Sequence, residues 1–296
     1  MFPNGTALTL GNFDGIHLGH QALLQKTVEE AQHLKLPSVV VTYYPNPSVV
    51  LGKRPNFKYL TPEQTKEKLI ASHNIDYLLV LEFTEELSRV RAEDFLENII
   101  INKLNAKYIV IGYNHFFGAE RRGDFALLEK NAQRLGYRVE LKEAVVNGEQ
   151  KISSSVIRKH IESGEVDQAN ILLGRKYSLE GEVAQGDKRG RTIGFPTANL
   201  KIPIDVLLPS IGVYACYTIF NGVRFKSMVN VGKNPTFDGR HMHIESNIFE
   251  FNEDIYGKQI EIQFVKKIRD EVKFDGIEFL KVQLTHDRED SLRILT

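Results

Sequence analysis

The chain has a single cysteine, no tryptophan and no excess of charge of either sign. The lone Cys216 excludes an intramolecular disulfide and a cysteine-rich zinc site, which fits a reducing compartment. It lies in the apolar run GVYACYTIF, and we interpret it as a core residue. Because Lys plus Arg equals Asp plus Glu at 38 each, the chain has no net positive charge that would favour binding to nucleic acid or to an anionic membrane.

Long apolar runs are absent as well. No uninterrupted run approaches the roughly 20 residues of a membrane helix, and the start MFPNGT lacks the basic and apolar segments of a targeting signal. We therefore expect a cytoplasmic protein without nucleic-acid or membrane partners, and make no prediction of its oligomeric state. The 296 residues suffice for two ordinary domains.

The first half alternates short apolar runs with segments of helical periodicity. The predicted strands cover residues 6–10, 37–44, 76–83, 106–113 and 138–146, and the predicted helices cover 20–34, 61–72, 91–104, 123–136 and 153–164. Such strand-then-helix units predict a doubly wound, Rossmann-like α/β domain with a mostly parallel sheet. Ligands bind these sheets at the carboxyl ends of the strands, where the strand order reverses.

The second half changes to strand candidates separated by turns. These candidates cover residues 177–185, 212–220, 223–232, 243–251 and 258–268, and a helical segment covers 276–295. Asn221-Gly222 between two of them is a strong hairpin signal, because both turn positions need positive φ. We predict a small antiparallel β-barrel with a C-terminal helix, and domains at 1–173 and 174–296.

The segment GNFDGIHLGH follows the first predicted strand and precedes a helix. A helix N-terminus presents unpaired N–H groups and partial positive charge, and Gly11, Gly15 and Gly19 let the backbone approach a phosphate closely. His17 and His20 could then stabilise charge on a phosphoryl group. Alternatively, one histidine caps the helix and the other is a solvated turn residue. A metal pair is disfavoured, since no carboxylate or third histidine is obviously supplied.

The segment ISSSVIRKH places three serines at a helix start, with Arg158 on the first turns. Serines are ordinary helix N-caps, which is one interpretation. Hydroxyls, free N–H groups and an arginine at one helix start also make a triphosphate site.

Together these segments resemble the nucleotidyltransferase half of the bacterial riboflavin kinase/FAD synthetase family, and the similarity extends to GYNHFFGAERRGDFALL. The resemblance implies that FMN phosphate attacks the α-phosphorus of ATP directly. It implies that His17 and His20 bind and stabilise the ATP phosphates, and that Arg158 holds the triphosphate. It also implies ATP contacts by Gly11, Asn12, Phe13, Asp14, Gly15, Ser153, Ser154 and Ser155.

Two positions depart from the family pattern, near the expected flavin and metal region. Asn46 stands where the family commonly has histidine, and Asn114 stands where it commonly has aspartate. We predict flavin contacts at both, through hydrogen bonds without charge. The departures leave two alternatives, a monofunctional riboflavin kinase with a degenerate N-terminal domain or a flavin- or nucleotide-sensing regulatory module.

A second site is indicated by GDKRGRTIGFPTANL, a flexible basic loop followed by hydroxyl and amide oxygens suited to Mg²⁺. The basic part alone is also typical of a solvated loop. With GFPTAN it resembles the flavokinase signature, as do GVYA, VNVGKNPTF, DIYGK and KIRDEVKFDG, so the similarity covers most of Gly181 to Gly276. The resemblance implies Mg²⁺ ligation by Thr197 and Asn199, and ATP contacts by Gly186, Asp187, Lys188, Gly194, Pro196, Thr197 and Asn199.

Phosphorylation of riboflavin needs a base for the ribityl hydroxyl, and alignment to the family's strand motif implies Glu245. There are two alternatives: Glu245 is an outward-facing surface residue, or Glu250 is the base. Arg269 and Glu271 resemble the family's flavin-side loop, whereas we interpret His241 and His243 as solvated loop residues. The chain is thus predicted to be a bifunctional enzyme that uses riboflavin, FMN, ATP and Mg²⁺.

Overall fold

The computed structural model describes residues 2–54, 56–186, 189–233 and 242–296. Between Ser154 and Ser155 the chain divides into two compact units, which are described separately. Helix α8 (Val166–Leu173) packs against strand β13 (Gln259–Arg269) of the second unit. The domain boundary at Gly174 stays a prediction.

The first unit is built on a parallel sheet, as predicted. Its strands are β1 (Thr6–Leu10), β2 (Ser38–Tyr44), β3 (Tyr77–Glu82), β4 (Ala106–Gly112) and β5 (Arg138–Lys142). They are arranged in the order β3-β2-β1-β4-β5. The order reverses between β1 and β4, so the segment after β1 lies at the predicted ligand-binding edge.

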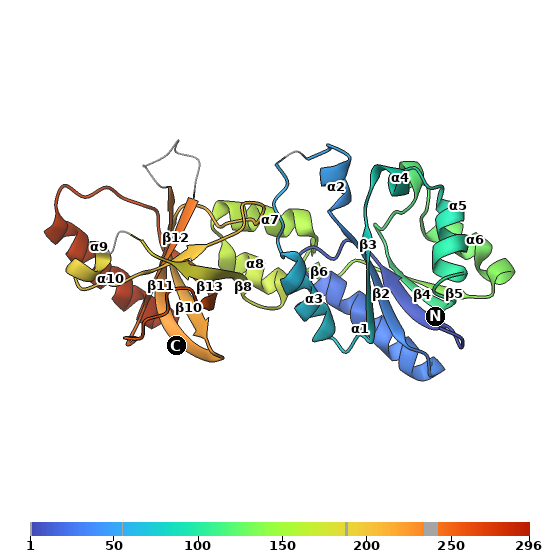
Figure 1. Ribbon diagram of the computed structural model, residues 1–296, viewed down its shortest axis with the longest axis horizontal. Coiled ribbons are helices and arrows are strands. Elements are labelled where there is room, and N and C mark those ends of the chain that lie inside the picture. Colours follow the sequence, from blue (N-terminus) through green and yellow to red (C-terminus); the bar gives the residue numbers. More distant parts are fainter. Residues whose placement is uncertain (1, 55, 187–188, 234–241) are drawn as a thin grey trace. The chain divides into compact units, whose positions relative to one another are not determined.

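Helices cover both faces of this sheet (Figure 1). Helices α1 (Leu18–Leu34) and α3 (Glu63–Ala71) pack on one face, where Val40 and Val110 meet Leu24 and Ile70. The other face, with Leu8 and Val39, packs against α5 (Ala92–Phe95), η1 (Leu96–Ile101) and α6 (Phe125–Leu135). Neighbouring strand residues point to opposite faces, which explains the continuous apolar runs.

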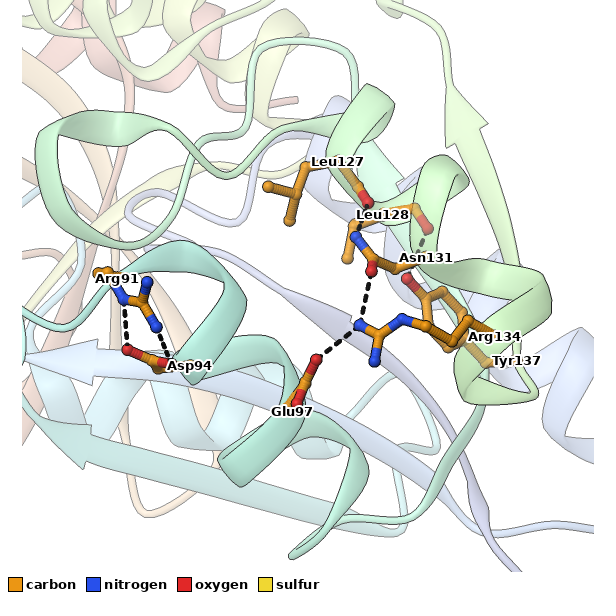
Figure 2. A network of polar contacts seen from close by, with 8 residues as sticks. All are labelled: Arg91, Asp94, Glu97, Leu127, Leu128, Asn131, Arg134 and Tyr137. Atoms are coloured by element: carbon orange, nitrogen blue, oxygen red, sulfur yellow. Dashed lines mark hydrogen bonds and ion pairs between the residues drawn. The ribbon is translucent and has the colours of Figure 1, made fainter.

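The predicted helix 91–104 is wrong as a single α-helix, because it divides into α5 and the π-helix η1. Figure 2 shows the polar contacts that join η1 to α6. Arg134 donates to Glu97 at 2.5 Å and to Asn131 at 2.7 Å, and Tyr137 donates to the Leu128 carbonyl. The exposed ion pairs contribute at most about 1 kcal/mol each, so apolar packing dominates here.

Shorter elements complete the first unit. They are α2 (Pro47–Val50), α4 (Glu85–Ser88), η2 (Ala119–Arg121) and the hairpin of β6 (Val146–Asn147) and β7 (Gln150–Lys151). The start of α7 (Ser154–Ser163) follows, at the division between the units.

The second unit contains the predicted antiparallel barrel, closed in the order β10-β11-β12-β9-β8-β13. Its remaining strands are β8 (Tyr177–Ala184), β9 (Ala198–Lys201), β10 (Gly212–Phe220), β11 (Val223–Lys233) and β12 (Met242–Ile248). Asn221 (φ 49°) and Gly222 (φ 79°) form the predicted hairpin turn. Cys216 is fully buried, as expected. Strand β9 was not predicted, because it is only four residues long and directly follows a proline-containing loop.

Besides α8, the C-terminal α10 (Ile277–Ile294) packs against this barrel, and the short α9 (Arg189–Thr192) lies in the connection from β8 to β9. The fully buried carboxylate of Asp287 on α10 accepts two hydrogen bonds from Arg269 on β13, at 2.8 and 2.7 Å. Such a bidentate pair orients both groups, so it fixes α10 against the barrel.

Candidate active sites

A cavity of about 630 Å³ opens at the carboxyl ends of β1 and β4. Its lining includes many of the residues predicted for adenylyl transfer, namely Gly11, Asn12, Phe13, Asp14, His20, Asn114 and Ser154. The structure therefore brings together, at one edge of the sheet, segments that are far apart in the sequence.

The turn after β1 has an unusual backbone. Phe13 (φ 49°) and Ile16 (φ 41°) adopt left-handed conformations although both are bulky, and both are fully buried. Asp14 stabilises the turn, because its carboxylate accepts the N–H groups of Leu60 and Thr61 at 3.0 and 3.2 Å. The Ser154 hydroxyl donates to the Asp14 carbonyl at 2.8 Å, so this turn also contacts the start of α7.

His17 is the N-cap of α1, and its Nδ1 accepts the N–H of His20 at 3.2 Å. The two imidazole rings stack, with centroids 3.7 Å apart and planes inclined by 13°. Since Nδ1 is an acceptor, the proton of neutral His17 lies on Nε2. The capping alternative is therefore correct for His17, whereas His20 lines the cavity and is no solvated turn residue.

Both histidines are poor bases in this environment. Burial lowers the pKa of His17 to about 4, and burial together with His17 and His115 lowers the pKa of His20 well below its usual value. Both are therefore neutral at pH 7, and they act as N–H donors rather than as fixed cations.

The lining also contains charged and histidine residues that were not predicted as site residues, namely Lys53, His115, Glu120 and Arg121. His115 is the third histidine that the sequence did not obviously supply. Only its position at the end of the fourth predicted strand could have indicated that His115 lies in the cavity wall. Even so, no cluster of three or more His, Cys, Asp or Glu side chains suited to a metal occurs in the described part of the chain.

Asn46 is buried beside this cavity and caps α2. Its Oδ1 accepts the N–H of Ser48 at 2.9 Å, and its own N–H donates to the Tyr59 hydroxyl at 3.0 Å. Asn114 is exposed on the cavity wall. Flavin contacts at these two residues stay predictions, as do the ATP contacts of Gly15, Ser153, Ser155 and Arg158.

The second unit has a cavity of about 290 Å³ within reach of the barrel strands. Polar residues on its wall include Thr197, Glu245, Arg269 and Glu271, all predicted for the kinase. The remaining wall is mainly apolar, with Ile193, Phe195, Val213, Met228, Val272, Phe274, Leu280 and Leu284. It can hold a flat apolar ring system.

Strand register aligns the polar side of this cavity. Glu245 on β12 lies opposite Asn230 on β11 and Asn199 on β9, and directly opposed residues present their side chains on the same face. Glu250, by contrast, lies on an exposed turn after β12 with φ 54°. This geometry favours Glu245 over Glu250 as the group nearest a bound substrate.

A neighbouring cavity of about 450 Å³ shares Thr197 with the 290 Å³ cavity. Pro196, Arg191 and Asp254 also line it. The Asn199 amide packs so tightly on Gly186 that a Cβ there would overlap it, which explains the glycine. Gly194 is exposed, with φ 87°. Asp187, Lys188 and His241 lie outside the described residues.

The interpretation of His243 as a solvated loop residue is wrong. It lies on β12, and its Nε2 is 4.0 Å from Glu245 Oε1 and 3.5 Å from Asn230 Nδ2. Asn247 was not predicted as a site residue. Its amide donates to the Pro196 carbonyl at 2.6 Å and so holds the Thr197 segment. Its position two residues after Glu245, on the same strand face, was the available signal.

A parallel sheet with a cavity at its switch point, joined to a closed barrel with a carboxylate-bearing cavity, defines a protein with two separate sites suited to phosphate chemistry. Residues 1–156 match the family model for FAD synthetase, and residues 173–295 match that for riboflavin kinase. The chain belongs to the bifunctional riboflavin kinase/FMN adenylyltransferase family.

Curated relatives bearing that name support the assignment. One from Listeria monocytogenes is 39% identical, with 96% of this chain and 90% of that protein covered. One from Bacillus subtilis is 36% identical, with 97% and 92% covered. A crystal structure described as a macrolide-efflux protein from Streptococcus pneumoniae is 34% identical, with a TM-score of 0.90 and 98% and 95% of the two chains covered. In the described residues of the present chain, no helix is long and apolar enough to cross a membrane.

Proposed function

We propose that the chain catalyses two successive reactions. The second unit transfers the γ-phosphoryl group of ATP to riboflavin and forms FMN and ADP. The first unit transfers the adenylyl group of a second ATP to FMN, forming FAD and pyrophosphate. The observation that carries this proposal is that each unit has its own cavity, lined by residues predicted for the respective reaction.

In the kinase, the apolar wall of the 290 Å³ cavity takes the flavin ring, and the adjoining 450 Å³ cavity takes ATP. The two cavities meet at Thr197, so the phosphoryl group passes near this residue. Glu245 accepts the proton of the ribityl hydroxyl as that oxygen attacks the γ-phosphorus. Arg269 and Glu271 border the flavin, with Arg269 held in place by Asp287.

The kinase residues fit Mg²⁺ as an ATP-bound ion. Thr197 offers a hydroxyl oxygen and Asn199 an amide oxygen, and Mg²⁺ prefers such hard oxygen donors. The close packing of Asn199 on Gly186 restricts the amide to this edge, opposite Glu245. Mg²⁺ bound by Thr197 and Asn199 would neutralise charge on the ATP phosphates.

In the adenylyltransferase, an FMN phosphate oxygen attacks the α-phosphorus of ATP, and pyrophosphate leaves. His20 lies in the cavity wall and can stabilise charge that develops on the phosphoryl oxygens. His17 is not among the residues that line the cavity, and we assign it to the ATP phosphates from the family resemblance alone. The N-terminal end of α1 adds its free N–H groups and partial positive charge. Ser154, which lines the cavity and belongs to the first unit, contacts the triphosphate. The roles of Ser153, Ser155 and Arg158 follow from the family resemblance alone.

We assign residues 1–173 to the adenylyltransferase and 174–296 to the kinase, in line with the two family matches. We also place the enzyme in the cytoplasm, with riboflavin, FMN and ATP as its partners. The support for this location is that the chain's single cysteine is free and buried.

A product time course tests the proposal. Purified protein is incubated with riboflavin, ATP and Mg²⁺, and flavins are separated by chromatography. We expect FMN first and FAD later, with pyrophosphate released in step with FAD and no product in excess chelator. FMN without FAD would indicate the monofunctional kinase, and flavin binding without any new flavin would overturn both activities.

A further inference from the structure

His115 is a cavity residue that the mechanism above does not use. It follows β4 directly, and its N–H donates to the Gly112 carbonyl at 3.0 Å, which turns the chain back toward the cavity. Its ring lies nearly parallel to that of Phe117, with centroids 6.3 Å apart and planes inclined by 19°. The ring is therefore held in one orientation on the wall that also contains His20.

The polar end of this ring is unsatisfied. Nε2 of His115 is buried and has no hydrogen-bond partner among the described residues, and the same is true of Nδ1 of His20. A buried polar atom without a partner costs free energy, whereas an apolar ring of similar size would not incur that cost. Two such nitrogens in one cavity wall point to a ligand that supplies their partners.

The partners of the charged side chains around the cavity favour an anionic ligand. Arg121 lies over the Phe116 ring at 4.6 Å, and both residues line the cavity together with Lys53. Two carboxylates also line it, but Asp14 accepts two backbone N–H groups, and Glu120 is paired with Arg122 at 2.7 Å. Burial and Arg121 lower the pKa of His115 to about 4, so His115 is neutral at pH 7 and can donate a hydrogen bond from Nε2.

We propose that His115 is a third phosphate-binding histidine of the adenylyl-transfer site, and that its Nε2 donates to a substrate phosphate oxygen beside His20. This proposal rests on the proposed FMN adenylyltransferase activity of the first unit. The phosphate belongs either to FMN or to the ATP polyphosphate, and the kinetic constants distinguish these sources.

The test uses His115→Phe, which keeps a buried ring against Phe117 but removes the nitrogen, and His115→Gln, which restores a donor. We expect His115→Phe to lower kcat/KM for FAD formation at least about tenfold, with the KM of FMN or of ATP rising according to whose phosphate is bound. His115→Gln recovers most of this loss. Riboflavin phosphorylation by the same preparations stays unchanged, which shows that the second unit is intact, and urea unfolding reports on the fold of the first unit.

Stability separates binding from a merely structural role. His115→Phe removes an unsatisfied buried nitrogen, so the first unit is expected to unfold at equal or higher urea concentration than the unaltered protein. His33→Phe, at the exposed end of α1, serves as the matched control and leaves both activities unchanged. If His115→Phe leaves kcat/KM for FMN and ATP within twofold, the proposal is overturned.

Calorimetric titration with pyrophosphate tests the phosphate-binding role of His115 independently of the proposed adenylyltransferase activity. If the unaltered protein makes no FAD, the proposed adenylyltransferase activity fails. The phosphate-binding role of His115 is then decided by affinity, which we expect to fall about tenfold in His115→Phe. Equal affinity of the two proteins for pyrophosphate, ATP and FMN would refute that role.

Discussion

Acid should destabilise the first unit through His17, and the size of the effect follows from its burial. His17 is 6% exposed, and its pKa falls from 6.5 to about 4 on folding. The unfolded chain therefore binds the proton more tightly, so the stability that neutral His17 permits is complete above pH 6.5 and is lost as the pH falls toward 4. Between about pH 7 and pH 5 this linkage costs about 2 kcal/mol of unfolding free energy.

The perturbation that isolates this effect is His17→Asn. Asparagine is a good N-cap and can accept the His20 N–H as His17 does, but it does not titrate. Loss of the ring contact with His20 changes stability about equally at both pH values and so cancels in the comparison. We expect the difference in unfolding free energy between pH 7 and pH 5 to shrink by about 2 kcal/mol.

Urea unfolding with pulsed hydrogen–deuterium exchange and mass spectrometry is the assay, because peptides from β1 and β4 report on the first unit and peptides from β10 and β13 on the barrel. The barrel peptides are the internal control and should be unaffected by the substitution. Equal pH dependence of the first unit in both proteins would refute the argument that burial keeps His17 neutral.

Three further substitutions test the two sites and the barrel. Glu245→Gln should lower FMN formation at least about a hundredfold while FAD formation from supplied FMN persists; equal loss of both would contradict separate sites. His20→Ala should lower FAD formation about a hundred- to a thousandfold and spare the kinase, so a folded variant that makes no FMN would show the assignment to be wrong. Asp287→Ala leaves Arg269 without its buried partner and should cost the barrel about 3–5 kcal/mol in urea unfolding; a loss below about 1 kcal/mol would count against that anchor.

The sheet and the barrel could be predicted from local patterns. Strands β1 and β10 coincide with their predicted ranges, because buried strands read as short apolar runs bounded by turn residues. The four-residue strand β9 could not be recognised, since its pairing with β8 and β12 decides its conformation. The π-helix η1 was missed for a similar reason, because its sequence has ordinary helical periodicity.

The cavity lining was predictable where one segment supplies it, as with Gly11, Asp14 and His20, whereas His17 caps α1 and does not line the cavity. The lining was not predictable where distant segments meet. His115 approaches His20 only because β4 pairs with β1, and Glu245 faces Asn199 only through the register of β12 and β9. The neutrality of the histidines also depends on burial, which spacing along the chain does not express.

The central claim is that two separable sites act in sequence, and a mixture of variants tests it most directly. His20→Ala is expected to make FMN but little FAD, and Glu245→Gln is expected to convert FMN to FAD but to make no FMN. Mixed in equal amounts with riboflavin, ATP and Mg²⁺, they should together form FAD at a rate that neither reaches alone. A mixture that accumulates FMN without FAD, or Glu245→Gln alone forming FAD from riboflavin, would contradict the account.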